Sequence, residues 1–211
     1  MRKRFKVALT IITILIIIMG VTLVSFKLQE SSSKNSNYKE INSIPGYGYT
    51  LEDRDTLLMQ ENFEKLKDVL SKKEIDYEKY AEYLSKLFII DLFTLNNKDN
   101  KYDVGSTEYV FPLVLDNYKL NVEDTVYKYI IDINNSSREI YAIVKSIELE
   151  NIEDVTYKYN DVEYSGYEVE LKWNYEKDFG YDNNGKLILI NDNNKLYVVS
   201  YKGSVEKWKE V

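Results

Sequence analysis

Asp91 is the residue whose surroundings most directly suggest chemistry. It lies within Phe88–Phe93 (FIIDLF), the most apolar stretch of the chain beyond its N-terminal segment. Apolar surroundings disfavour the charged form of a carboxylic acid, so one interpretation is an acid or base with a raised pKa. The other is that Asp91 faces water or accepts a hydrogen bond from one of the 20 tyrosines. We favour the second interpretation.

Several other chemistries are excluded by residues that the chain lacks. It contains no histidine and no cysteine, which removes Ser-His-Asp triads, thiol catalysis, disulfides and zinc sites built from these residues. The sequence also has no phosphate-binding loop and no nucleophile elbow. We therefore expect no catalytic residue, no metal site and no cofactor, and we predict that the chain is not an enzyme.

Two acidic segments invite a cation-binding interpretation. If Gly185 is placed at the sixth position of a calcium loop, Gly180 falls at the first position and Asn191 at the twelfth. Both positions then lack the required acid, so a hairpin turn at Asn184-Gly185 explains the segment better. The second segment is a cluster of acids near a strand end, which we interpret as solvated rather than cation-binding: Glu148, Glu150, Glu153 and Asp154.

Two tyrosines, Tyr47 and Tyr49, lie among the glycines and proline of residues 44–50 (IPGYGYT). Proline and glycine interrupt regular structure, so this segment reads as a loop leading into the domain. Its tyrosines either pack on the domain, which we favour, or form an exposed aromatic contact for a partner. They are therefore our candidates for a partner contact.

Residues 7–26 organise the rest of the chain. This run of about 20 residues carries no charge and is long enough as a helix to cross a hydrocarbon core of about 30 Å. Residues 1–6 are basic, so we expect them to be cytoplasmic and everything after residue 26 to lie outside the cell membrane. The alternative is a cleaved signal peptide. Residues 27–49 are predicted to be a tether and lead-in loop, and residues 50–211 an exterior domain.

The composition and net charge of the chain limit the classes of partner that we expect it to bind. Hydrophobic residues make up 44% of it, too many for a disordered tail, and its net charge is −7. An acidic domain argues against binding to nucleic acid or to anionic lipid. The abundance of Lys, Asn, Ile and Tyr suggests an AT-rich bacterial genome, and an exterior domain without disulfides suggests a Gram-positive cell surface.

The hydrophobic periodicity changes along the exterior domain. It has a helical period up to about residue 131 and a period of two after Arg138. The cleanest alternation of apolar and polar residues, Tyr167–Tyr175, predicts a half-buried strand. The predicted helices are Thr50 to Leu70, Asp76 to Leu95, and one beginning at Asn121; the other predicted strands are Thr107–Phe111, Ile143–Leu149, Val155–Tyr159, Leu187–Ile190 and Lys195–Tyr201.

Helices that precede a run of antiparallel strands predict an α+β fold, with the helices packed on one face of a curved sheet. This order resembles the nuclear transport factor two-like cone fold. With the N-terminal anchor, it is similar to the exterior domains of single-span bacterial proteins of conjugation and type IV secretion channels. The resemblance implies that the strand Tyr167–Tyr175 lines a concave face, with Trp173 and Asp91 as candidates for a ligand pocket.

Two functions follow from these observations. The first is a non-enzymatic protein-interaction or assembly module of the bacterial envelope, which binds envelope proteins or itself, because tyrosine is favoured at interfaces. The alternative is a small-molecule-binding domain, sensory or weakly enzymatic, in which Asp91 and a nearby tyrosine move protons.

Overall fold

The computed structural model describes residues 38–203, and from Glu40 onward these residues belong to one compact unit. The predicted membrane segment, residues 7–26, and the basic residues 1–6 lie outside the described residues. Within residues 38–203, no helix has the length and apolarity needed to cross a membrane. The compact unit begins earlier than the predicted boundary at residue 50, because the segment before that residue forms a hairpin on the domain.

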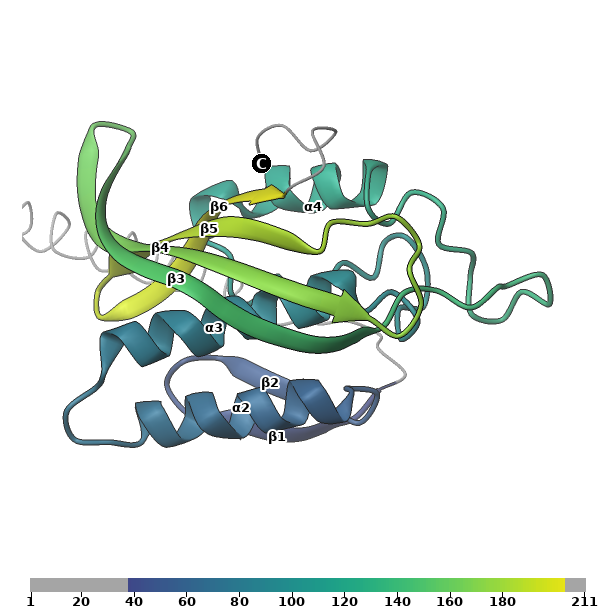
Figure 1. Ribbon diagram of the computed structural model, residues 1–211, viewed down its shortest axis with the longest axis horizontal. Coiled ribbons are helices and arrows are strands. Elements are labelled where there is room, and N and C mark those ends of the chain that lie inside the picture. Colours follow the sequence, from purple (N-terminus) through teal and green to yellow (C-terminus); the bar gives the residue numbers. More distant parts are fainter. Residues whose placement is uncertain (1–37, 204–211) are drawn as a thin grey trace, which may run out of the picture. The chain divides into compact units, whose positions relative to one another are not determined.

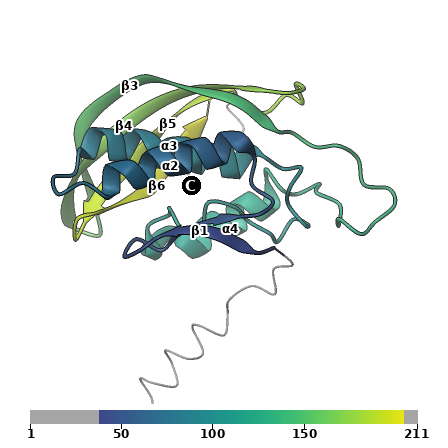
Figure 2. The same ribbon diagram turned by 90° about the horizontal axis from the view of Figure 1, so that it is seen from below.

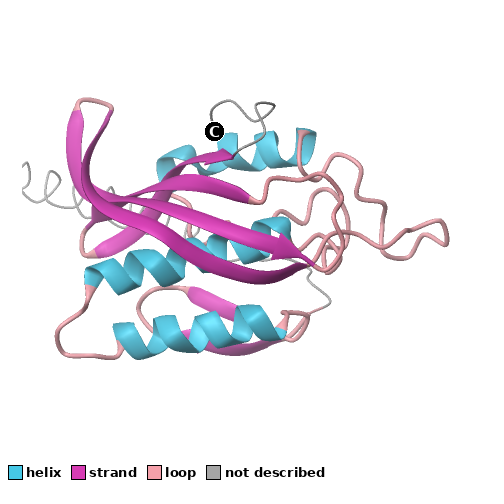
Figure 3. Ribbon diagram, in the orientation of Figure 1, coloured by secondary structure: helices cyan, strands magenta, loops and turns pink. Residues whose placement is uncertain are grey.

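The described residues form an α+β fold, as predicted (Figures 1 and 3). Four antiparallel strands make one sheet in the order β3-β4-β5-β6, and β1 and β2 form a separate hairpin. Figure 2 shows the large sheet arching over α2 and α3. In chain order the elements are β1 (Glu40–Ile44), β2 (Tyr49–Glu52), α2 (Leu57–Leu70), α3 (Tyr77–Phe93), the 3-10 helix η1 (Pro112–Val114), α4 (Leu115–Asp124), β3 (Val144–Tyr159), β4 (Val162–Tyr175), β5 (Asn184–Asp192) and β6 (Lys195–Gly203).

The long β3–β4 hairpin extends beyond the rest of the sheet (Figure 1). Strand β5 pairs with β4 only from Gly166 onward, so the outer ends of β3 and β4 pair only with each other within the described sheet. Their turn places Asn160 and Asp161 at φ values of 47° and 64°. These left-handed conformations suit a two-residue turn that follows the twist of the strands. The periodicity predicted two strands here, Ile143–Leu149 and Val155–Tyr159, but the structure has the single strand β3.

The start of the first helix was predicted wrongly. Thr50 does not cap it but lies in β2, where its amide and hydroxyl donate to the carboxylate of Glu108. The cap is Thr56, whose side chain accepts from the amide of Met59. Because Thr56 can cap an orphan amide as well as Thr50 can, local capping chemistry did not distinguish the two positions.

The second helix was predicted correctly and the third was displaced. Asp76 caps α3 by accepting from the amide of Lys79. In contrast, α4 ends near the point where the sequence predicted a helix to begin at Asn121. Residues that follow α4 still bury an apolar side, including Val126 and Ile130, but they do so from turns. The predicted strand Thr107–Phe111 is reduced to one bridge between Val110 and Val198.

The turn predicted at Asn184-Gly185 is not a hairpin turn, because both residues lie inside β5. The β5–β6 turn is formed instead by Asn193 and Asn194, with φ values of 52° and 66°. Asparagine tolerates this backbone region, so either dipeptide satisfied the local requirement. Gly185 serves close packing: an added Cβ would lie 2.9 Å from the carbonyl oxygen of Lys202.

The core lies between the concave face of the sheet and α3. Alternate residues of β4 point into it, which confirms the period of two read from the sequence. The ring of Trp173 stacks on Phe93 of α3, with 5.4 Å between centroids. This packing fixes the helix against the sheet and leaves the polar ends of β3 and β4 beyond the start of α3.

Candidate functional site

Asp91 is a paired carboxylate and does not have the raised pKa that its apolar neighbours suggested. Its side chain is 19% exposed and pairs with the ammonium group of the buried Lys98. It also accepts a hydrogen bond from the amide of Ser106. Burial raises the pKa of Asp91, but Lys98, the Ser106 amide and Arg54 together hold it below its usual value. A tyrosine does donate to Asp91, as the alternative expected, but Tyr127 reaches the backbone carbonyl at 3.3 Å, while the carboxylate is held by Lys98 and Ser106.

Trp173 is fully buried, so its ring is not open to a ligand. Its indole nitrogen donates to the hydroxyl of Tyr175 at 2.9 Å, and that hydroxyl donates to the carbonyl of Asp182 at 2.6 Å. Trp173 contacts Phe93, whereas Asp91 contacts Lys98. The structure therefore places the two pocket candidates in separate, filled environments.

Tyr49 and Tyr47 pack on the domain, which was the favoured interpretation. Tyr49 has no exposed surface, and its hydroxyl lies 2.6 Å from that of Tyr80. Tyr47 is partly buried and stacks on Tyr49, with 5.8 Å between centroids. Because Tyr49 is fully enclosed, only Tyr47 of this pair has surface left for a partner.

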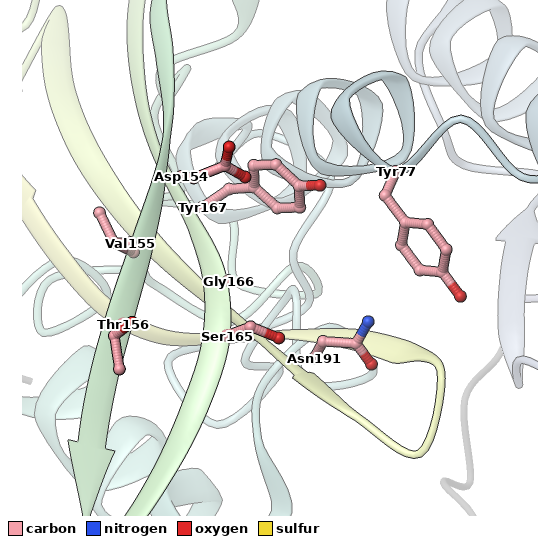
Figure 4. A pocket seen from close by; sticks show the side chains of 8 residues that line it. All are labelled: Tyr77, Asp154, Val155, Thr156, Ser165, Gly166, Tyr167 and Asn191. Atoms are coloured by element: carbon pink, nitrogen blue, oxygen red, sulfur yellow. The ribbon is translucent and has the colours of Figure 1, made fainter.

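An open groove of about 420 Å³ lies where the start of α3 faces the sheet (Figure 4). Figure 4 shows the rings of Tyr77 and Tyr167 on opposite sides of it, with Asp154 beside Tyr167. Four elements line the groove: α3, β3, β4 and β5. The lining residues are Tyr77, Asp154, Val155, Thr156, Ser165, Gly166, Tyr167 and Asn191.

Strand register brings the polar lining residues together. Asp154 pairs with Tyr167 and Thr156 pairs with Ser165 across β3 and β4. Paired residues share a face of the sheet, so these four side chains lie on the concave side. Gly166, between them, is required by close packing, because a Cβ there would lie 1.8 Å from the carbonyl oxygen of Leu189.

The surroundings of the groove are acidic. Burial raises the pKa of Tyr167, and the carboxylates of Asp154, Glu78 and Asp76 raise it further. A tyrosine ring attracts cations through its face, and a neighbouring carboxylate adds a direct ion pair. The groove is therefore suited to a cationic group and unsuited to an anion. Among the described residues, no group of three or more acids forms a candidate metal site.

A second cluster of tyrosines adjoins this end of α3. The ammonium group of Lys195 lies 4.7 Å from the centroid of Tyr49 and 4.8 Å from that of Tyr197. Burial lowers the pKa of Lys195, and burial raises the pKa of Glu108 to about 7. The hydrogen bonds from Thr50 to Glu108 lower that pKa but do not offset burial. The contacts of Lys195 with Tyr49 and of Glu108 with Thr50 hold the β1–β2 hairpin against the rest of the domain.

Comparison of the chain with protein-family models, with curated proteins and with solved structures gave no match. The resemblance to cone-fold channel components therefore stays a prediction. The sequence did place Tyr167 on a strand that lines the concave face, but it pointed to Trp173 at the other end of that strand. Tyr77 was missed, because a tyrosine in the first turn of a helix carries no local signal for a groove.

Proposed function

We propose that the chain is a membrane-anchored, non-enzymatic module that binds a protein of the bacterial envelope. In this proposal residues 7–26 span the cell membrane once as a signal anchor, the N-terminus is cytoplasmic and the domain lies outside. The domain is a cone-like variant of the α+β fold, with its groove at the open end. The observation that carries the proposal is the tyrosine-lined groove beside a strand edge that no other described strand covers.

Two features of this region suit a protein partner. Tyrosine contributes a large amphipathic ring at little entropic cost and is enriched at the centres of interfaces. Strand β3 pairs only with β4 among the described strands, so its other edge has backbone groups available for an added strand. By contrast, two buried carboxyls with shifted pKa values are engaged within the fold: Asp91 by Lys98, and Glu108 by Thr50.

Site-specific photo-crosslinking in the cells that make the protein tests this proposal. A photoreactive phenylalanine analogue replaces Tyr77 in the full-length chain. The matched control carries it in place of Tyr129, which is 77% exposed and lies outside the groove. We expect a defined cross-linked protein from position 77 and not from position 129. Identical cross-linking from both positions, or none from either, would contradict a protein-binding role for the groove.

The dimensions of the groove also favour a second candidate function, the binding of a small molecule. Its volume of about 420 Å³ lies within the range typical of ligand pockets, roughly 300–1,000 Å³. In that case cross-linking from position 77 gives no protein adduct, and a soluble metabolite raises the unfolding temperature of the purified chain. Replacing Tyr77 would abolish that rise, whereas replacing Tyr129 would leave it unchanged.

A further inference from the structure

The groove combines features that select one kind of side chain. Two tyrosine side chains line it from opposite sides, and Asp154 lies beside the ring of Tyr167 (Figure 4). The acids that act most strongly on Tyr167, besides Asp154, are Glu78 and Asp76 at the start of α3. A cation between two rings and a carboxylate gains both ring and ion-pair attraction, whereas an anion is repelled.

The edge of β3 continues directly from the groove, since Asp154, Val155 and Thr156 line it. Strand β3 runs for 16 residues, which is long for an edge strand. Its register is interrupted between Val144 and Ser146 and between Leu149 and Asn151, and it is regular from Asn151 to its end. The regular part is therefore the part that borders the groove and can accept an added strand.

The charges along β3 decide what can pair with it. Three exposed acids, Glu148, Glu150 and Glu153, precede Asp154 on this strand. Its two lysines are Lys145 and Lys158, and the ammonium group of Lys158 pairs with Asp161 at 3.0 Å. An acid placed opposite Glu153 or Asp154 on an added strand would destabilise the pair, because like charges there repel. An incoming strand that carries lysine or arginine meets the opposite situation. The acids of this edge thus favour a basic segment.

From this arrangement we infer that the groove and the adjoining edge of β3 accept an extended basic segment of a partner protein. The backbone of that segment pairs with β3 between Asn151 and Tyr159. One of its lysine or arginine side chains enters the groove between Tyr77 and Tyr167 and forms an ion pair with Asp154. This inference rests on the proposed function and names the chemistry of the partner at the same site.

Fluorescence anisotropy on the full-length chain in detergent tests the inference. The probes are labelled, blocked seven-residue peptides of alternating serine and valine with lysine, arginine, citrulline or glutamate at the centre. We expect the lysine and arginine peptides to bind about tenfold more tightly than the citrulline peptide, which keeps the shape of arginine without its charge. Binding should weaken as salt is raised, because part of the attraction is between partly exposed charges.

Variants of the chain separate the groove from the general acidity of the protein. Asp154→Asn keeps the shape of the side chain and Tyr167→Leu removes the ring; both should lose the preference for a basic centre. Asp116→Asn removes an exposed acid from α4, away from the groove, and should keep the preference. Equal affinity for the arginine and citrulline peptides, or an equal loss in the Asp116 variant, would overturn the inference.

The two experiments can fail independently. A protein adduct from position 77 together with equal binding of all four peptides would retain a protein-binding groove but reject the basic segment. Preference for free lysine or arginine amides over the peptides, at equal concentration, would reject the added strand and assign the groove to a small cation. Self-adducts from position 77 would identify a second copy as the occupant and would overturn the inference.

Discussion

Replacing Glu108 by glutamine should change the pH dependence of folding. Glu108 has a pKa raised to about 7 from an ordinary value of 4.5, first because it is buried. A carboxyl that holds its proton more tightly when folded stabilises the fold at low pH, and that stability is lost as the pH rises from 4.5 to 7. The ionised form is thus a cost to the fold above about pH 7.

The size of this effect follows from the shift. A difference of 7 − 4.5 = 2.5 units, at about 1.4 kcal/mol per unit, gives an upper value of about 3 kcal/mol. Glutamine resembles the protonated acid and can keep both contacts with Thr50, since its oxygen accepts from the amide and its nitrogen donates to the hydroxyl. We therefore expect Glu108→Gln to be more stable than the natural chain by up to about 3 kcal/mol near pH 8, and by under about 1 kcal/mol near pH 5.

Urea denaturation of the full-length chain in detergent measures this difference. The fluorescence of the buried Trp173 reports unfolding at about pH 5 and about pH 8. Asp116→Asn, which neutralises an exposed carboxyl, is the matched control and should change stability little at either pH. If Glu108→Gln stabilises the chain equally at both pH values, or destabilises it at the higher one, ionisation of a buried Glu108 is not what limits stability.

Three further substitutions test the contacts that hold the site. Asp91→Asn should destabilise the domain by about 3–5 kcal/mol in the same denaturation assay, because it leaves the ammonium group of the buried Lys98 without its charge partner. The control Lys186→Gln removes exposed pairs with Glu168 and Glu170 and should cost under about 1 kcal/mol. Gly166→Ala should lower the unfolding temperature, because its Cβ would overlap the carbonyl oxygen of Leu189. The control Gly46→Ala has open space around it but a φ of 85°, so it should show only the smaller cost of backbone strain. Equal losses in the two variants would contradict the close packing at Gly166. Trp173→Ala should cost about 3–5 kcal/mol through the cavity left against Phe93, and a variant as stable as the natural chain in calorimetry would show that Trp173 is not part of the core.

The regular elements that were predicted correctly are those whose local sequence signals pointed to one structure. The stripe of apolar residues and the cap at Asp76 identified α3, and strict alternation identified β4. The errors arose where two local signals were equivalent. Thr50 and Thr56 can both cap a helix, and Asn184-Gly185 and Asn193-Asn194 can both form a turn. Tertiary contacts, such as the hydrogen bonds of Thr50 with Glu108, decided between them.

The candidate site shows why pairs of residues were harder to predict than elements. An apolar stretch around Asp91 suggested a raised pKa, but the sign of the shift depends on Lys98, which approaches only after α3 has ended and the chain has turned back. Tyr77 and Tyr167 line the same groove only because β4 lies beside the start of α3. Neither relation is periodic along the chain. Local alternation therefore predicted that β4 is a half-buried strand, while the opening of the sheet face at Tyr167 depended on contacts distant in sequence.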